Sequence, residues 1–468
     1  MINTMLKKES LIYGIGHILT RIITFLLLPI FTNTLNTYEY GILSLVYTFC
    51  GFFTATLHLG LDASLLKHYK QSDNRHRILF TTNTYIPLII VNLLFVLIFI
   101  VFKDYLAVHI LGINNSLIFI LMLLIIFLDG LWSIPMVLLR ANHTPFKYLA
   151  CTLTNVISNI IFIYLLFFIL ELGILGIIFS NVLSSLLVFI VSLPVVINKI
   201  SLKALDFTTF KKLFKFGYPF IFAGIFSMII ELSDRYIIKY LLSIEMVGIY
   251  NAGYKLGMLM LLIIMGFNMA WQPYFLDNKN NKNLESITNN VWIIFVFLCG
   301  TIICLIEPIS HISIFGFTLI GSEFKESLEI VPIICLGYLF HGAYILLLPG
   351  PFLTGKTTYI AFVRGVGAIS NIILNFILIP MHGIQGAAIS TLLSFVLMSC
   401  ILLFINKKIY PLNYHLNAVL TSLLILICYV FIIQQNPTIF LRCVMIIIMP
   451  IIMFLTGCLR FNISLNDS

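Results

Sequence analysis

Residues 369–396 read ISNIILNFILIPMHGIQGAAISTLLSFV, an apolar run, a glycine-containing turn and a Gly/Ala/Ser-rich run. The stretch 157–187, ISNIIFIYLLFFILELGILGIIFSNVLSSLL, has the same order of segments in the first half of the chain. A weaker echo relates TLNTYEYGILSLVY (34–47) to YLLSIEMVGIYNAGY (240–254), in which Gly41 corresponds to Gly248. Chance similarity between Ile-rich helices is the alternative, but the matched order favours an internal duplication with a period of about 210 residues.

The composition predicts an all-α integral membrane protein. Of 468 residues, 60% are hydrophobic and 10% are charged, and the mean hydropathy is +1.08. Soluble domains carry about 25% charged residues, so this chain has too little charge to cover a surface in water. We see no cleaved signal peptide, and the nine cysteines form no C-x-x-C pair, which speaks against a disulfide framework or a zinc site.

Each membrane span needs about 20 mostly apolar residues. On this basis we expect fourteen spans, at roughly 10–34, 40–62, 79–102, 115–139, 148–170, 173–197, 213–238, 246–274, 288–308, 328–349, 356–379, 384–405, 412–433 and 438–459. If the N-terminus is cytoplasmic, 19 of the 27 Lys and Arg residues lie on the cytoplasmic side and 5 on the outer side. This positive-inside bias predicts that both termini are cytoplasmic.

A period of about 210 residues encloses six spans, so the two repeats have the same orientation in the membrane. We therefore expect two parallel six-helix lobes around a central cavity, at 1–204 and 205–410, and a C-terminal helix pair at 411–468. The loops are short, and no soluble catalytic domain is apparent.

Three basic residues, Arg21, Lys255 and Arg364, lie roughly 12–17 Å inside their predicted spans. Each costs at least about 2.5 kcal/mol at mid-bilayer, so we expect them to face a polar cavity or a partner. His17 and Asn251 precede Arg21 and Lys255 by four residues and share their helix faces, so they are further candidates for substrate binding.

Arg364 lies on a stripe of small and polar residues with a helical period. Its members are Thr357, Ala361, Arg364, Ala368, Asn371 and Asn375. Close helix packing with amide hydrogen bonds explains the alanines and asparagines equally well, but it does not explain the arginine. We therefore predict that Arg364 lines the cavity, with Asn371 as a further candidate for substrate binding.

The candidate acidic residues are fewer. Glu231 precedes Arg235 by four residues, which favours an ion pair within one helix. Asp129, near Trp132, either pairs with a base on another helix or serves as a proton site. H+ or Na+ are the candidate coupling ions, and no organic cofactor is expected.

The stretch GPFLTGKT (350–357) fits the phosphate-loop pattern G-x-x-x-x-G-K-[ST]. That loop works only between a buried strand and a helix, whereas a membrane span precedes this one. Pro351 also removes a backbone N–H that an anion cradle would use. We predict a cytoplasmic turn with Thr354 as N-cap of the next helix, and neither a nucleotide nor a nucleic acid as partner.

Three stretches resemble the polysaccharide branch of the multidrug, oligosaccharidyl-lipid and polysaccharide exporter superfamily. They are FKFGYPFIFAGIFSMIIELSDRYIIKYLLSIEMVGIYNAGYKLGMLM (214–260), LTGKTTYIAFVRGVGAISNIILNFILIPMHGIQGAAISTLLSF (353–395) and, more loosely, GLDASLLKHY (60–69). In the third stretch His68 stands where the family often has arginine.

The resemblance implies a non-enzymatic flippase for undecaprenyl-diphosphate-linked oligosaccharides of O-antigen (lipopolysaccharide) or capsule in the bacterial cytoplasmic membrane. It also implies alternating access, and Arg21, Lys255 and Arg364 as cationic residues that hold the diphosphate or acidic sugars. A polysaccharide polymerase and a chain-length regulator are candidate partners besides the membrane lipids. The alternatives are a lipid II flippase, a cation-coupled multidrug antiporter and, from another class, a membrane glycosyltransferase, polymerase or ligase.

Overall fold

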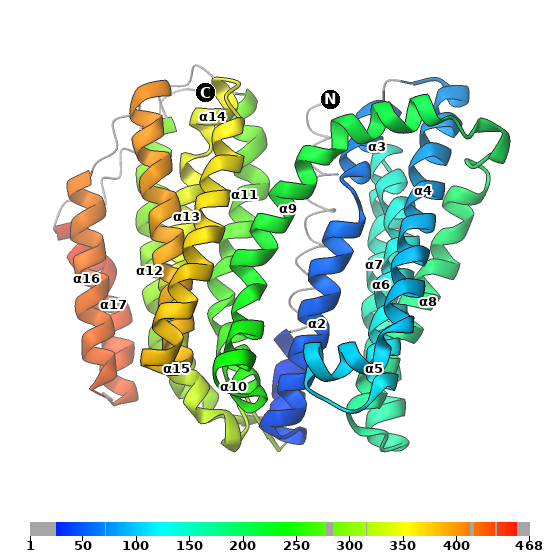
Figure 1. The fold of residues 1–468 in the computed structure, drawn as a ribbon. Helices are drawn as coiled ribbons and strands as arrows, with labels where there is room; N and C mark the ends of the chain where they lie inside the picture. The colour runs from blue at the N-terminus through cyan, green and yellow to red at the C-terminus, as the bar shows by residue number, and fades with distance from the viewer. Residues whose placement is uncertain are drawn as a thin grey trace. The chain divides into compact units, whose positions relative to one another are not determined.

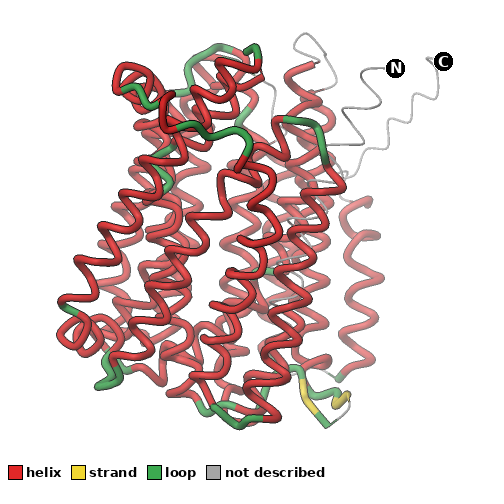
Figure 2. The backbone as a smooth tube through the Cα atoms, turned by 90° about the vertical axis from the view of Figure 1, so that its right-hand side faces the viewer, coloured by secondary structure: helices red, strands yellow, loops and turns green. Residues whose placement is uncertain are grey.

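The computed structural model describes residues 25–70, 72–277, 284–314, 316–411, 416–435 and 438–455. These residues are helical almost throughout, which confirms the all-α prediction (Figure 2). The exception among them is a pair of short antiparallel strands, β1 (Ser313–Ile314) and β2 (Phe317–Thr318). They lie between the predicted spans 288–308 and 328–349, where Asn33 Nδ2 donates a hydrogen bond of 2.7 Å to the carbonyl of Thr318.

Helices coincide with all fourteen predicted spans, although for the first span only residues 25–34 are described. Among the described residues, ten helices are long and apolar enough to cross a membrane. One of the ten, Thr358–Ile409, has 52 residues and would be about 78 Å long if straight, more than twice the span that a bilayer requires. Gly383 interrupts it with φ 57° and ψ −138°, so this helix accounts for two of the predicted spans. The chain is a multi-pass membrane protein.

The chain packs into two compact units. Unit 1 comprises Leu35–Gly248, and unit 2 comprises Leu28–Thr34 and the residues from Ile249 onward. This division is based on contacts in the structure, whereas the predicted lobes are based on the sequence repeat. The lobe boundaries at 204 and 410 therefore stay a prediction.

Unit 1 is a helical bundle in which α6 packs against α4 and α8, and α7 packs against α8 (Figure 1). Its elements are α2 (Thr37–Leu57), α3 (Leu61–Lys70), α4 (Asn74–Val101), α5 (Lys103–Leu106), η1 (Ala107–Leu111), α6 (Ser116–Ala141), α7 (Pro145–Ile163), η2 (Tyr164–Ile169), α8 (Gly173–Ile197), η3 (Leu202–Ala204) and α9 (Phe207–Leu241). The helix α10 (Ile244–Gly257) begins in unit 1 and ends in unit 2.

Unit 2 is built around α13, which packs along α15, while α16 and α17 cover α12 on the outside (Figure 1). Its further elements are α11 (Leu259–Asp277), α12 (Leu284–Ser310), η4 (Ser322–Ile330), α13 (Val331–Leu347), α14 (Pro349–Leu353), α15 (Thr358–Ile409), α16 (Leu416–Gln434) and α17 (Ile439–Leu455). Arg442 of α17 forms a 2.7 Å salt bridge with Glu307 of α12, and this buried arginine attaches the C-terminal helix pair to the unit.

A glycine break and an asparagine contact between helices occur in both units. Gly173 before α8 and Gly383 within α15 occupy corresponding places in the repeat, and both have φ 57°. Asn159, which corresponds to Asn371 in the repeat, donates through Nδ2 to Ser184 Oγ at 3.3 Å. Asn371 donates through Nδ2 to Thr391 Oγ1 at 3.5 Å, which is a different place in the repeat from that of Ser184. The internal duplication stays a prediction.

The two glycines of the weaker sequence echo pack against each other inside unit 1. A Cβ at Gly248 of α10 would overlap the backbone oxygen of Thr37 and would lie 3.0 Å from the backbone nitrogen of Gly41. A Cβ at Gly41 of α2 would overlap the backbone oxygen of Ile244. Glycine is needed at both positions because the two helix backbones approach this closely.

Candidate functional site

The most informative basic residue of unit 2 lies against an aromatic ring. Arg364 is in the first half of α15 and is partly buried. Its guanidinium carbon lies 6.0 Å from the ring centroid of Tyr344 on α13, which is within the range of cation–π attraction. The contact holds the guanidinium beside the ring, and the planar fork of donors that this group carries suits an anion such as phosphate.

His341 extends this arrangement by one helical turn. Its ring stacks on Tyr344 with centroids 6.0 Å apart and an interplanar angle of 13°, and it lies 5.0 Å from the ring of Phe395. The buried Nδ1 atom of His341 has no hydrogen-bond partner among the described residues. A buried polar atom of this kind calls for a ligand or a water molecule. We call Tyr344, His341, Phe395 and Arg364 the basic–aromatic cluster.

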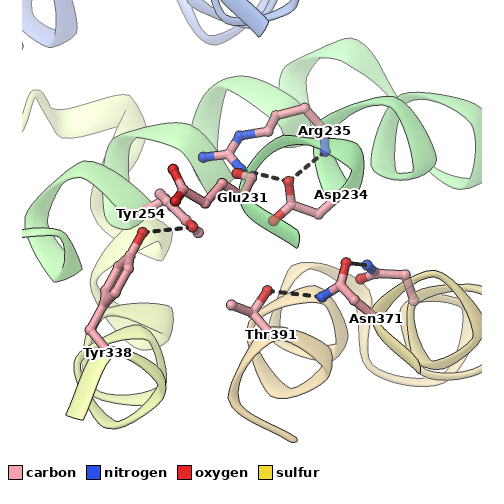
Figure 3. Close-up of polar contacts among 8 residues, drawn as sticks. Glu231, Asp234, Arg235, Tyr254, Tyr338, Asn371 and Thr391 are labelled. Carbon is pink, nitrogen blue, oxygen red and sulfur yellow. Dashed lines mark hydrogen bonds and ion pairs between the residues drawn. The ribbon is translucent and has the colours of Figure 1, made fainter. Parts of the chain in front are cut away.

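The helix that carries Asn251 and Lys255 is fixed to the same side of α13. Tyr338 donates its hydroxyl to the hydroxyl of Tyr254 at 2.8 Å, and both tyrosines are fully buried (Figure 3). The ring of Tyr338 lies 6.4 Å from that of His341. Lys255 directly follows Tyr254 in α10 and, like Asn251, is partly buried.

Asn371 lies within helix packing. It is 0% exposed, donates to Thr391 and accepts a 3.0 Å hydrogen bond from Asn375 Nδ2 (Figure 3). Interhelical hydrogen bonds of this kind contribute on average about 0.6 kcal/mol in membrane proteins. The contacts of Asn371 and Asn375 are therefore those of close helix packing. A contact between Asn371 and the substrate stays a prediction.

In unit 1 the polar centre is a carboxylate. Asp129 Oδ1 on α6 accepts hydrogen bonds from Trp132 Nε1 at 3.0 Å and from Ser185 Oγ of α8 at 2.7 Å. In the part of the chain that the structure describes, no basic side chain forms an ion pair with Asp129. This arrangement holds the carboxyl group in place through neutral donors, and a role of Asp129 as a proton site stays a prediction.

Arg235 of α9 forms a salt bridge of 2.6 Å with Asp234, and both residues are at most 3% exposed (Figure 3). A second hydrogen bond runs from Arg235 to the backbone carbonyl of Glu231. Arg235 thus contacts the main chain of Glu231 and the carboxylate of Asp234, and an ion pair with the Glu231 side chain stays a prediction. The next residue, Tyr236, donates its hydroxyl to the carbonyl of Leu45 at 3.0 Å. These contacts give the Asp234–Arg235–Tyr236 element a structural role within unit 1.

Two predicted site residues, His17 and Arg21, lie outside the described residues. Within the described ranges, no group of three or more His, Cys, Asp or Glu side chains is placed to hold a metal ion.

The GPFLTGKT stretch follows the helix α13 and not a strand, so it lacks the setting of a phosphate loop. The prediction for Thr354 was wrong. Its hydroxyl donates to the carbonyl of Gly350 at 2.8 Å, because the threonine ends α14, and α15 begins at Thr358 with Thr357 as N-cap.

Several contact residues were not predicted from the sequence, among them Ser185, Tyr254 and Asp234 as the partner of Arg235. Ser185 and Tyr254 lie on helices far in sequence from their partners, where periodicity carries no information about neighbours. The adjacent Asp234 and Arg235 could have been recognised as a charge pair from their position inside a span.

Comparison with known proteins identifies a family of polysaccharide biosynthesis proteins. Residues 6–279 match the family described as polysaccharide biosynthesis proteins. An "Uncharacterized membrane protein" of Haemophilus influenzae is 24% identical over 399 residues, covering 82% of this chain and 94% of that protein. A "Putative O-antigen transporter" of Shigella flexneri is 23% identical over 224 residues, covering 47% of this chain and 52% of that protein.

Solved structures of transporters share the fold. A structure of the lipid II flippase MurJ in an inward closed conformation superposes with a TM-score of 0.76 and 17% identity, over 96% of this chain and 98% of that one. An inward-facing multidrug resistance transporter of the MATE family has a TM-score of 0.68 and 11% identity, over 83% and 94% of the two chains. The fold is that of the multidrug, oligosaccharidyl-lipid and polysaccharide exporter superfamily, and the chain belongs to the family of polysaccharide biosynthesis proteins.

Proposed function

We propose that this protein is a flippase that moves undecaprenyl-diphosphate-linked oligosaccharide units from the cytoplasmic to the outer leaflet by alternating access. The lipid tails stay in the bilayer while the diphosphate and sugars pass through the protein. The protein itself makes and breaks no covalent bond. We place it in the bacterial cytoplasmic membrane with both termini in the cytoplasm, as the positive-inside bias predicts.

The observation that carries this proposal is the basic–aromatic cluster of unit 2. Arg364 lies over the Tyr344 ring inside a membrane-spanning helix, and His341 adds a buried nitrogen without a partner among the described residues. Guanidinium groups bind phosphate through two parallel hydrogen bonds, and aromatic rings stack on sugars and support the cation. A cationic centre of this kind suits an anionic cargo and repels a cationic drug. Lys255 and Arg21 are the further candidates for binding the diphosphate.

A lipid II flippase is the second candidate function, and the overall similarity to MurJ favours it. Both cargoes carry a polyprenyl diphosphate, so the cluster serves either one equally well. The family match at residues 6–279 favours oligosaccharide units of O-antigen or capsule. A polysaccharide polymerase and a chain-length regulator are then the proteins that receive the product at the outer leaflet.

We further propose that Asp129 couples transport to H+ or Na+. Its carboxylate is held by neutral donors from Trp132 and Ser185, whereas the buried Arg235 is neutralised by Asp234. A carboxylate held in this way can release a proton or exchange it for a cation without breaking a salt bridge.

The test of the function is the variant Arg364→Ala, produced in cells whose own copy is deleted. We expect surface polysaccharide to be lost while the amount of protein in the membrane is unchanged. Lys356→Ala, earlier in the chain in an exposed turn, is the matched control and should keep the polysaccharide. Normal polysaccharide with Arg364→Ala would exclude the cationic site.

A further inference from the structure

The first turns of α9 are not needed to cross the membrane. The helix Phe207–Leu241 has 35 residues, about 52 Å, whereas a span needs about 20 residues. Figure 1 shows these first turns lying across the ends of α3 and α4 of the same unit before the helix turns down. Pro219 removes one hydrogen bond of the helix and permits the change of direction.

Buried polar groups of α4 hold the chain in place just before this helix. Asn83 donates from Nδ2 to the carbonyl of Ala204 at 2.7 Å and accepts from the backbone N–H of Asp206 at 2.8 Å. Thr82 Oγ1 accepts from the backbone N–H of Ser201 at 3.1 Å. Thr82 and Asn83 are at most 1% exposed, so they fix where α9 begins.

Asp206 then caps α9. Its carboxylate accepts hydrogen bonds from the hydroxyls of Thr208 and Thr209, both at 2.6 Å, and from the backbone N–H of Thr209 at 2.9 Å. These donors hold the pKa of Asp206 well below its usual range. The charged cap favours the helix start, so the first turn is defined before any partner binds.

One face of these turns packs against the rest of unit 1. Leu213 and Gly217 are buried, and a Cβ at Gly217 would lie 2.7 Å from the backbone oxygen of Gly60. Next to this face runs an aromatic stripe at helical spacing. It consists of Phe207, Phe210, Phe214 and Tyr218, with successive ring centroids 6.3, 5.9 and 6.5 Å apart.

The outward side of the same turns is apolar and basic. Phe207 is 76% exposed, and Leu202 just before the helix is 74% exposed. Lys211, Lys212 and Lys215 are exposed on the face beside the aromatic stripe. The sequence from 207 to 230 contains no acidic residue. Aromatic rings next to lysines are the pattern of a helix that lies in the membrane interface.

We propose that residues 202–218, the interfacial segment, bind an anionic lipid surface. Phe210 and Phe214 pack against the core of unit 1, whereas Phe207 and Tyr218, the exposed ends of the stripe, enter the boundary between headgroups and acyl chains, about 5–10 Å deep. The three lysines contact lipid phosphates. Each lysine near an anionic leaflet strengthens the attraction about fivefold. The segment follows the sixth predicted span and includes the first residues of the seventh, 213–238, so the anionic leaflet anchors the connection between the two predicted lobes. This inference does not depend on the identity of the cargo.

The test uses the full-length protein in nanodiscs that contain phosphatidylglycerol and phosphatidylcholine in equal amounts. Phe207→Trp introduces a tryptophan as a fluorescence reporter. Its signal is the difference between the fluorescence of the variant and that of the parent protein, which contains Trp132, Trp271 and Trp292. Two samples are compared, and in each of them one of the two lipids carries bromine in its acyl chains. The brominated lipid quenches the fluorescence of nearby tryptophan. We expect both lipids to quench the reporter, and the anionic lipid to quench it several-fold more strongly.

The lysines are tested in the same reporter background by replacing Lys211, Lys212 and Lys215 with glutamine. The preference for phosphatidylglycerol should disappear while quenching by both lipids persists, because the aromatic stripe is intact. Replacing Lys407 and Lys408, two exposed lysines at the end of α15, should leave the preference unchanged.

Three outcomes would overturn the proposal. They are a reporter that neither lipid quenches, equal quenching by both lipids in the parent reporter protein, and loss of preference with the Lys407 and Lys408 replacements as well. A blue-shifted reporter without quenching would point to a protein surface instead of the bilayer.

Discussion

Corresponding places of the predicted repeat hold side chains of different chemistry in the two units. Asp129 of unit 1 and His341 of unit 2 are separated by the same offset as the repeated asparagines Asn159 and Asn371. Their contacts correspond too, since Asp129 contacts Ser185 and His341 contacts Phe395, a pair separated by nearly the same offset. In unit 1 this place holds an acid bound by neutral donors, and in unit 2 it holds an aromatic cluster with Arg364.

We interpret this difference as two separate roles for the two predicted repeats. The basic copy suits the anionic cargo, and the acidic copy suits a coupling cation or proton. Two ion pairs, Asp234 with Arg235 and Glu307 with Arg442, belong to neither role, and we interpret them as structural.

The largest effect is expected at the structural pair of unit 1. Arg235→Ala leaves the buried Asp234 carboxylate without its partner, which typically costs about 3–5 kcal/mol of stability. We expect a strong fall in thermal stability of the purified protein and little correctly folded protein in the membrane. The double variant with Asp234→Ala should recover part of the loss. A stable Arg235→Ala protein that fails to transport would instead place Arg235 in the cargo site.

The next effect concerns the cargo site itself. Arg364→Ala should weaken binding of a polyprenyl diphosphate about 10- to 150-fold, because a hydrogen bond to a charged group contributes about 1.5–3 kcal/mol. Arg364→Lys keeps the charge but loses the paired hydrogen bonds, so its loss should be smaller. Titration of the purified variants with the lipid measures both. Equal affinity in all three proteins would remove Arg364 from the site.

Asp129→Asn tests the acidic copy. Asparagine keeps an oxygen for Trp132 and Ser185, so stability should change by no more than about 1 kcal/mol. Transport, however, should lose its dependence on pH or on Na+. Transport into vesicles across a range of pH, with and without Na+, measures this. A variant that keeps the full ion dependence would show that Asp129 is only a packing residue.

The smallest effect is expected at Asp206, outside the membrane-spanning part. Hydrogen bonds from Thr208 and Thr209 lower its pKa in the folded protein, so its contribution to stability is present above the ordinary pKa of aspartate. That contribution is lost as the pH falls through the lowered folded value. Asp206→Asn keeps a capping oxygen but cannot titrate, so the acid-dependent part of the melting curve should shrink. An unchanged acid dependence would show that Asp206 does not contribute to it.

Much of the fold could be predicted from the sequence, because membrane spans depend on a simple physical requirement. The apolar run of about 20 residues locates a helix without knowledge of its neighbours. The break at Gly383 was predictable from a glycine turn between two such runs. Thr354 shows the limit of this reasoning, since a hydroxyl can end one helix as well as begin the next, and only the backbone decides.

The candidate site could be predicted only in part. Arg364 and Asp129 were evident because a charge inside a span requires an explanation. The rings around Arg364 could not be assigned, because Tyr344, His341 and Phe395 fill apolar helices that are rich in such residues. Asn371 was proposed for substrate binding because it lies on the same helix face as Arg364. Periodicity alone does not distinguish the residues of that face that pack against another helix from those that line a cavity.

The central claim is that the protein moves a diphosphate-linked oligosaccharide lipid between leaflets through a site that contains Arg364. The most direct test reconstitutes the purified protein in vesicles with a labelled polyprenyl-diphosphate oligosaccharide in one leaflet, and measures its arrival in the other with an impermeant sugar-binding probe. We predict transfer with the parent protein and with Lys356→Ala, and transfer at the rate of protein-free vesicles with Arg364→Ala. The account is contradicted if the parent protein moves no lipid, or if Arg364→Ala moves it equally fast.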